Sequence, residues 1–523
     1  MKKIHISYLI SRILKIRQNS YFISHISYFV IVVFLFAVIL FINYYDVLKF
    51  HYFVPPGSDP VTHVTIAKEI LATGKSLNTG YPPGFHYIVA ELSKISGTDP
   101  IQTTVYFYPF LMFLSALAVY LFARQFFGKW AALLTLLIFG FISPQPRQTL
   151  WDGGFPNVIT ADCIMIFGFL FFLRAYKYEK WRDVILAGII LGAVPAFHHL
   201  SSYLMVFLLI LFTPALLLFS LIIKDNFKKK ARVLIAALTI AFIIGVYPAY
   251  TYFGKGYLIQ IAGSFIAHAA SLKGFIWRST SFMGDAPPFD ISWYALVVSP
   301  YLWFLGLLSI PFLLKRFIKD KKAEYLFMFV WMIGGIIISR PYFFSPLPGR
   351  FTRELTIPLS ICSAVFIRES VGFFKNFWPR AILIILIAIF LFKGLQGIPN
   401  WVGKYNPMVF VNSTDKQALD WVKENTSKEA KIAVAPGNCW FTLLTQRNNQ
   451  NIGTNFDTIN QYDYLYINRW QNDWMWGFDP TPFIKIRNEA ASRSDLQLIK
   501  TFREDANRPE ENENGIAIYR VKK

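Results

Sequence analysis

The sequence predicts a polytopic α-helical membrane protein with roughly eleven spanning helices, followed by a small α/β domain outside the membrane. Three observations carry this prediction. The 523 residues are 54% hydrophobic and only 16% charged, whereas soluble domains carry about 25% charged residues. Uncharged apolar runs of about 20 residues, long enough to cross a bilayer, recur along the chain. These runs stop near residue 399, and a polar segment follows.

The apolar runs make residues 1–399 a membrane domain. We expect spanning helices at roughly 27–45, 103–123, 130–146, 157–173, 183–200, 203–223, 233–253, 292–314, 324–339, 355–367 and 381–399. The first run is predicted to be a signal anchor, because the bulky sequence Phe41-Ile42-Asn43-Tyr44-Tyr45 stands where a cleavage site would need small residues.

Basic residues predict the orientation, because cytoplasmic loops are enriched in Lys and Arg. The N-terminal segment carries Lys2, Lys3, Arg12, Lys15 and Arg17, and the short loops after the even-numbered helices are also rich in Lys and Arg. The intervening loops are longer and contain few basic residues. We therefore expect a multi-pass protein of the cell membrane with a cytoplasmic N-terminus and an extracytoplasmic C-terminal domain.

The net charge of +21 follows this topology. Residues 1–399 hold 36 Lys and Arg against 16 Asp and Glu, a net +20, whereas residues 400–523 hold 16 against 15. The basicity is therefore a topology signal that also suits anionic lipid head groups, and we reject nucleic-acid binding. Cys439 is the single cysteine of the tail, so no disulfide is expected within that domain.

The polar tail, 400–523, is expected to fold as an α/β domain. Ser413-Thr414-Asp415 can cap a helix, and Lys431–Ala435 and Ile516–Val521 alternate like strands. Two glycosylation sequons begin at Asn412 and Asn425. The tail also holds four tryptophans that suit either sugar binding or packing at a membrane interface: Trp440, Trp470, Trp474 and Trp476.

Two outer loops are long and partly apolar. In the first, 46–102, we expect two helices lying at the membrane surface, over Val61–Leu71 and Pro82–Ser96. In the second, 254–291, Tyr257–Leu272 is apolar with few charges and has the same character. Such segments bring side chains to the interface between membrane and water.

Asp59 stands just before the first of these helices, and His63 follows one helical turn later. Asp59 can serve simply as a helix N-cap. It can equally act as a general base or, with His63, as a ligand of a divalent cation such as Mg²⁺ or Mn²⁺. The residues alone leave both interpretations open.

The wider pattern of this loop resembles the GT-C superfamily of integral membrane glycosyltransferases, which use polyprenyl-phosphate-linked sugars. Asp59 and His63 are followed by Gly74, by Tyr81-Pro82-Pro83-Gly84-Phe85-His86, and by Glu91 and Gly97. The layout of helices and outer tail is also similar, in the manner of protein mannosyltransferases and aminoarabinose transferases. The resemblance implies that Asp59 is the catalytic or metal-binding carboxylate, and it makes Tyr81 and His86 candidate site residues.

Further candidates lie in the next outer segments. Asp152 sits in Trp151-Asp152-Gly153-Gly154, either as a turn residue or as a second catalytic or metal-binding carboxylate. Asp162 lies inside the following helix, where a carboxylate is functional unless the helix end is hydrated. His198 and His199 end the fifth helix and suit a phosphate contact, a metal site or a solvated pair.

Arg350 and Arg353 lie in Pro348-Gly349-Arg350-Phe351-Thr352-Arg353-Glu354, on the outer side where basic residues are sparse. This segment resembles the corresponding segment of many GT-C enzymes, in which an Arg-aromatic pair is followed by a proline in the next helix, here Pro358. Guanidinium groups pair with phosphate in bidentate geometry, so we expect these arginines to bind the donor phosphate. Glu354 would pair with an arginine or join the site.

The expected function is transfer of a sugar from a polyprenyl- or dolichyl-phosphate donor to a protein, lipid or glycan acceptor at the outer face. No glycine-rich nucleotide loop is present, which agrees with an already activated donor. The alternatives are a transporter or flippase of lipid-linked glycans, a polysaccharide polymerase or ligase, and a structural or sensory membrane protein. Transporters place ionisable groups near the bilayer midplane, whereas most acids here lie at the outer rim.

Overall fold

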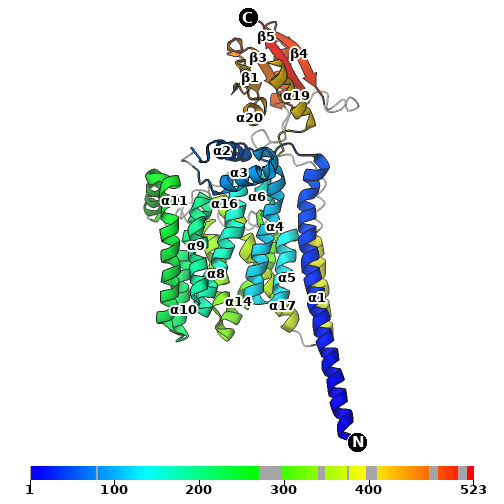
Figure 1. Cartoon of the computed structure of the whole chain (residues 1–523), viewed down its shortest axis with the longest axis vertical. Coiled ribbons are helices and arrows are strands. Elements are labelled where there is room, and N and C mark those ends of the chain that lie inside the picture. Colours follow the sequence, from blue (N-terminus) through cyan, green and yellow to red (C-terminus); the bar gives the residue numbers. More distant parts are fainter. Residues whose placement is uncertain are drawn as a thin grey trace.

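The computed structural model describes residues 2–77, 81–269, 297–339, 348–373, 376–395, 409–469, 481–503 and 515–523. It is a bundle of long helices with a small sheet domain at one end (Figure 1). The helices α2 and α3 lie across that same end of the bundle, which we call the α2–α3 face (Figure 1).

The helices of the bundle have the following bounds. They are α1 (Lys2–Phe50), α2 (Asp59–Thr73), α3 (Gly84–Ser96), α4 (Pro100–Phe127), α5 (Lys129–Leu137), α6 (Arg147–Trp151), α7 (Phe155–Asn157), α8 (Met165–Tyr178), α9 (Trp181–Ala193), α10 (His199–Ile222), α11 (Phe227–Ala269), α14 (Pro300–Asp320), α15 (Ala323–Ile338), α16 (Pro348–Glu354), α17 (Thr356–Phe373) and α18 (Phe377–Leu395). Two π-helical segments, Ile138–Ile142 and Val158–Ile164, and a 3₁₀ turn, Val194–Ala196, continue or precede these helices.

The chain is a multi-span membrane protein. Among the described residues, seven helices are long and apolar enough to cross a bilayer: Ile26–Phe50, Pro100–Phe127, Phe155–Tyr178, His199–Ile222, Phe227–Tyr252, Pro300–Asp320 and Arg350–Phe373. A shorter apolar helix is α15. Each of the eleven predicted segments overlaps a helix of the structure, so the predicted fold class is confirmed.

Aromatic side chains pack the centre of the bundle. Phe212 of α10 stacks on Phe327 of α15 with ring centroids 3.9 Å apart, and Trp331 meets Phe122 of α4 and Phe169 of α8 edge to face. All five rings are fully buried. This core joins four helices into one rigid frame, from which the segments at the α2–α3 face project.

The predicted surface helices are present. The first is α2, which contains the whole of the predicted Val61–Leu71, and the second is α3. α3 has buried residues along one face, including Phe85, His86 and Val89. In the second long loop, α11 continues through Tyr257 to Ala269, and the residues after it lie outside the described part.

The tail contains a mixed five-stranded sheet of order β2-β1-β3-β5-β4. Its elements are α19 (Ser413–Asn425), β1 (Ile432–Ala435), α20 (Phe441–Thr445), β2 (Asn449–Asn451), β3 (Tyr464–Ile467), α21 (Thr481–Ser492), β4 (Leu496–Phe502) and β5 (Ile516–Val521). β1 is parallel to β2 and β3, and β5 is antiparallel to β3 and β4. The two predicted strands are therefore confirmed.

One detail of the tail differs from the sequence prediction. The cap of α19 is Asn412, one residue earlier than Ser413, and its side chain accepts a hydrogen bond from the Asp415 backbone N–H at 2.9 Å. The Asp415 carboxylate accepts in return from the Asn412 N–H at 2.9 Å. This reciprocal capping box satisfies two backbone donors at once, which a cap at Ser413 would not.

Candidate functional site

Two glycines lock the first and second loops of the α2–α3 face together. Gly57 has φ +92°, and a Cβ there would lie 2.5 Å from the Asp152 carbonyl oxygen. Gly153 has φ +85°, and a Cβ there would lie 2.4 Å from Cδ of Pro60. Both positions therefore require glycine for conformation and for space. This contact sets Asp59, at the start of α2, beside the turn that carries Asp152.

Asp59 lies in the first turn of α2 and is exposed. Partial loss of hydration raises the pKa of its carboxyl group, the positive charge of Arg350 opposes that rise, and the charge of Asp152 adds to it. Asp59, Asp152 and Arg350 therefore influence one another electrostatically, although they come from three separate segments. The raised pKa makes Asp59 a stronger base than an ordinary aspartate.

Asp152 is tied to α16 by an ion pair. Nη2 of Arg353 lies 2.8 Å from Oδ2 of Asp152, and Nη1 of Arg353 donates to Oγ1 of Thr149 at 3.4 Å. The Arg353 side chain is 16% exposed, whereas that of Asp152 is 44% exposed. One oxygen face of Asp152 thus remains open to solvent while the arginine is held against the protein.

Two buried histidines, His63 and His86, lie close to Asp59 and join α2 to α3. Nδ1 of His63 lies 3.0 Å from Nε2 of His86, a hydrogen bond between α2 and α3. Burial lowers the pKa of both, to about 4 for His86, so both are neutral at pH 7. The ring of Tyr81 packs against both imidazoles, with centroids 5.4 and 5.5 Å away. Burial and the Asp59 charge raise the pKa of the Tyr81 phenol, which is therefore a neutral hydroxyl.

The start of α10 closes the site on the far side of Tyr81. The Tyr81 ring lies 6.4 Å from that of His198 and 5.5 Å from that of His199. Gly84 permits this approach, because a Cβ there would lie 2.7 Å from the Ala196 carbonyl oxygen. The first turn of α3 and the 3₁₀ turn that precedes α10 are therefore in close contact.

His198 is the N-cap of α10, and its Nδ1 accepts from the Ser201 backbone N–H at 3.2 Å. Its proton is therefore on Nε2. Burial lowers the pKa of His198, and the nearby charges of His199, Arg350 and His63 lower it further. His198 is consequently a neutral hydrogen-bond donor and not a cation.

A buried polar chain continues from His198 into the membrane domain. Oγ of Ser201 lies 2.8 Å from Nδ1 of His198 and donates to Oδ1 of Asn157 at 3.2 Å. The Glu354 side chain contacts Asn157 and the carboxyl group of Asp162. Asp162 lies in the π-helical segment Val158–Ile164 and is buried. Asp162 and Glu354 are therefore buried behind the site and joined to it through α7 and α10.

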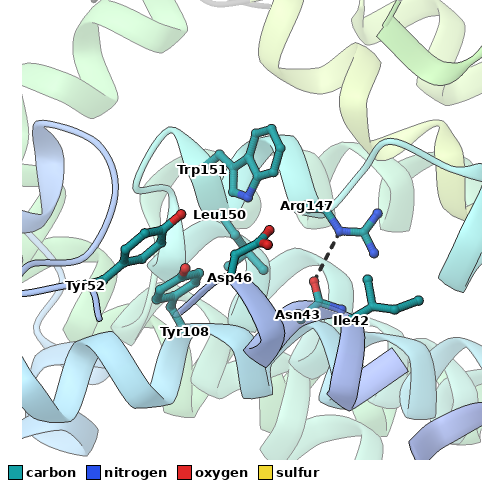
Figure 2. Close-up of a pocket in the computed structure, with 8 residues that line it drawn as sticks. All are labelled: Ile42, Asn43, Asp46, Tyr52, Tyr108, Arg147, Leu150 and Trp151. Carbon is teal, nitrogen blue, oxygen red and sulfur yellow. Dashed lines mark hydrogen bonds between the residues drawn. The ribbon is translucent and has the colours of Figure 1, made fainter. Parts of the chain in front are cut away.

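Away from these residues, a small pocket lies where α1 meets α6 (Figure 2). There the buried Arg147 donates from Nε to Oδ1 of Asn43 at 3.2 Å, and Asp46 lines the same pocket with Tyr52 and Trp151 (Figure 2). Burial lowers the pKa of Arg147 to about 9, and Asp46 opposes the change. Space for about 10 Å³ remains, enough for a single water molecule. The pocket anchors the segment that leads to Asp152.

The structure thus gathers the predicted site residues on one face. At the rim, Arg350 and Asp152 act electrostatically on Asp59, and Arg353 pairs with Asp152. Beside them lie one tyrosine and four histidines: Tyr81, His63, His86, His198 and His199. The carboxyl groups of Asp162 and Glu354 are buried behind this set. Sequence reasoning missed Thr149, Asn157 and Ser201, whose roles depend on contacts that no local spacing signals. Trp440 is fully buried, so it offers no exposed face to a sugar. Trp470, Trp474 and Trp476 lie outside the described residues.

Asp59, His63 and Asp152 are the residues predicted to hold a divalent cation. Among the described residues, no group of three His, Cys, Asp or Glu side chains is close enough to hold an ion. His63 also uses Nδ1 toward His86. Asp59, His63 and Asp152 therefore form no three-ligand cluster in the described part of the chain, and the divalent cation stays a prediction.

Comparison with known proteins gives one family match and several similar structures. Residues 81–248 match the family described as dolichyl-phosphate-mannose-protein mannosyltransferase. The match begins at Tyr81 and covers α3 to the middle of α11, which includes the turn of Asp152 and the start of α10. The comparison with curated protein sequences gives no match.

Three similar structures share the fold at low sequence identity. The Archaeoglobus fulgidus oligosaccharyltransferase has TM-score 0.56 and 14% identity, covering 83% of this chain and 69% of that one. ArnT from Cupriavidus metallidurans, bound to undecaprenyl phosphate, has TM-score 0.54 and 12% identity, covering 94% and 98%. The mycobacterial arabinofuranosyltransferase AftD has TM-score 0.53 and 11% identity, covering 94% and 40%. The resemblance to the GT-C superfamily is confirmed at the level of the fold: residues 81–248 match the mannosyltransferase family, and the chain shares its multi-span fold with these three membrane glycosyltransferases.

Proposed function

We propose that the protein transfers a sugar from a polyprenyl-phosphate carrier to an acceptor at the α2–α3 face. One observation carries the proposal. Asp59, whose carboxylate has a raised pKa, lies within the electrostatic reach of Arg350 and Asp152, and Asp152 pairs with Arg353, although these residues come from distant parts of the chain. A base and a pair of guanidinium groups are the two elements that transfer from a phosphate leaving group requires.

The donor phosphate would bind between Arg350 and the start of α10. A guanidinium group neutralises the charge that develops on the leaving phosphate, and a helix N-terminus adds backbone donors and a favourable dipole. His198 caps α10 with its proton on Nε2, so it can donate one further hydrogen bond. Arg353, held by Asp152, contributes positive charge from a fixed position.

The acceptor hydroxyl would be activated by Asp59. Its proton passes to the Asp59 carboxylate while its oxygen attacks the anomeric carbon of the donor sugar. The bond between that carbon and the phosphate oxygen breaks, and the polyprenyl phosphate leaves with the electron pair. Proton acceptance by a positioned base contributes about 10²–10⁴-fold to such a step.

The neutral side chains around Asp59 would orient the acceptor. His63, His86 and Tyr81 are uncharged at pH 7 and lie next to one another. Uncharged side chains can hydrogen-bond the acceptor's hydroxyl groups without adding a charge that would compete with the arginines for the donor phosphate. Asp152, with one open oxygen, would accept a hydrogen bond from the sugar or the acceptor.

The class of donor is supported by the similar structures. ArnT from Cupriavidus metallidurans was solved with undecaprenyl phosphate, and the Archaeoglobus fulgidus oligosaccharyltransferase with a tethered acceptor peptide. We infer a lipid-phosphate donor for this chain, with the N-terminus in the cytoplasm and the α2–α3 face outside, as the basic loops predict. A protein, a lipid or a glycan would serve as acceptor.

Purified protein incubated with radiolabelled polyprenyl-phosphate sugars and candidate acceptors tests this function. We expect label to move from lipid to acceptor in the wild type and not in Asp59→Asn. The same assay with chelator tests the predicted divalent cation, because a cation held jointly by Asp59, Asp152 and the donor phosphate would make transfer chelator-sensitive. Movement of intact label across proteoliposomes without transfer would instead indicate the flippase alternative.

A further inference from the structure

A groove lies at the end of the bundle opposite the α2–α3 face. It is an open groove with a volume of about 540 Å³, lined by residues of α4, α8 and the start of α9: Leu121, Arg124, Gln125, Phe167, Leu170, Phe171, Arg174 and Arg182. Arg124 is 24 residues beyond the start of α4, a distance of about 36 Å along the helix axis. Figure 1 shows these helices running from one end of the bundle to the other. The groove is therefore separate from the proposed active site.

The lining changes from apolar to basic along the groove. On α8, Phe167, Phe171 and Arg174 lie on one helical face, and on α4 Leu121 precedes Arg124 by three residues on the same face. The phenylalanines and the leucine thus lie deeper in the membrane than the guanidinium groups. An acyl chain beside the first set would place a head group beside the second.

Positive charge exceeds negative charge in the groove. The buried carboxylate of Asp183 lies 3.3 Å from Arg174 and 3.9 Å from Arg182. Among the described ion pairs, Asp183 is the carboxylate that Arg174 and Arg182 contact, so the groove has three guanidinium groups and this one acid beside two of them. The side chain of Arg182 is 72% exposed, and Arg124 is also exposed.

The helix ends explain only part of this charge. Arg124 lies in the last turn of α4, where the helix dipole favours cations, whereas Arg174 lies just before the last turn of α8. Arg182 lies in the first turn of α9, where the dipole disfavours a cation. An anionic occupant of the groove accounts for all three positions.

Aromatic side chains mark the level of the lipid head groups at this end. Trp181 and Tyr178 are 56% and 40% exposed, and Nε2 of Gln125 donates to the Tyr178 hydroxyl at 3.2 Å. Exposed Trp and Tyr concentrate where the bilayer meets water. The basic end of the groove therefore lies at the depth of a phosphate group, with its apolar end facing acyl chains.

We propose that this groove binds one anionic phospholipid, whose phosphate lies between Arg124, Arg174 and Arg182 and whose acyl chains lie along Phe167 and Phe171. Gln125 fixes Arg174 for this role, because Nη1 of Arg174 donates to its Oε1 at 2.9 Å. The occupant is a lipid and not an acidic protein, because half of the lining is apolar and opens beside the spanning part of α8.

Native mass spectrometry of the purified full chain tests the proposal. The protein would be prepared in mixed micelles with phosphatidylglycerol or with phosphatidylcholine of the same acyl chains. We expect one retained phosphatidylglycerol and little phosphatidylcholine, and at least about a tenfold weaker retention in the double variant Arg124→Gln, Arg182→Gln. The matched control Lys319→Gln, Lys322→Gln removes the same charge from the same end of the bundle, outside the groove, and should retain the lipid.

Two further arms distinguish the possible occupants. Phe171→Ala should weaken retention as well, and soluble glycerol phosphate should not displace the lipid. Equal retention of both lipids, unchanged retention in the arginine double variant, or displacement by glycerol phosphate would each overturn the proposal. The arginine double variant should still transfer sugar, because the groove lies far from Asp59. A failure of the lipid proposal can therefore be distinguished from a failure of the proposed function.

Discussion

Arg353 and Asp152 form an ion pair of 2.8 Å that joins α16 to the turn following α6. The pair holds an arginine of the proposed phosphate site at a fixed distance from the Asp59 loop. Arg353→Gln should lower kcat/KM for the lipid donor by about 10- to 100-fold, because a charge-assisted contact is lost.

Asp152→Asn tests whether that pair acts as a unit. It should weaken donor use by a smaller factor, and the loss in the double variant with Arg353→Gln should be less than the product of the two single losses. Donor titrations for the four proteins of the cycle give the coupling. Fully additive losses would contradict a shared role for the two side chains.

The acid limb of the pH profile should report Asp59. Its carboxylate must be unprotonated to accept a proton, so activity is lost as the pH falls through its raised pKa. Arg350 lowers that pKa, so Arg350→Gln should move the acid limb to higher pH. Asp152 raises it, so Asp152→Asn should move the limb to lower pH. Profiles of kcat/KM at saturating acceptor measure both shifts, and identical limbs would contradict the assignment of Asp59 as the base.

The glycine contact between the loops should be essential for turnover. Gly153→Ala adds a methyl group 2.4 Å from Pro60 at a residue with φ +85°, so the Asp59 loop must move. Gly74→Ala is a matched control, because Gly74 has φ +78° with no atom within 4 Å of an added Cβ. We expect the control to lose about 1 kcal/mol of stability and keep its kcat, whereas Gly153→Ala should lose most of its transfer activity. Thermal unfolding and single-turnover assays separate the two effects.

Stability should fall in acid because of the buried histidines. The pKa of His86 is about 4 in the folded protein and about 6.5 when unfolded. Above pH 6.5 both states are neutral and the group has no effect. Between pH 6.5 and 4 the unfolded state binds the proton preferentially, which costs about 2 kcal/mol at pH 5. Compared with the wild type, His86→Gln should show a smaller drop in unfolding temperature between pH 7.5 and pH 5.

Much of the fold could be predicted because bilayer physics leaves a strong signal in sequence. Uncharged runs such as Pro100–Phe127 and His199–Ile222 have few alternatives to spanning a membrane. The strands Ile432–Ala435 and Ile516–Val521 were equally visible from alternation. The cap of α19 was placed one residue late because Asn412, Ser413 and Thr414 are all good caps, and the reciprocal contact with Asp415 decides among them.

The site was predicted residue by residue but not as a geometry. Asp59, Asp152 and Arg353 each had a local signal, and only tertiary packing shows that Gly57 and Gly153 set the first two side by side. Asn157 and Ser201 carry no motif, because their role lies in linking His198 to Glu354 through space. The basic groove could not be predicted either. In the sequence, Arg124, Arg174 and Arg182 lie in separate segments, and each indicates only the orientation of the chain in the membrane.

The most direct test of the central claim is transfer of label from a polyprenyl-phosphate sugar by purified wild-type protein and by Asp59→Asn, each shown to be folded by its unfolding temperature. The account predicts a labelled acceptor with the wild type and a loss of about 10²-fold or more with the variant. Transfer by folded Asp59→Asn at the wild-type rate would contradict it.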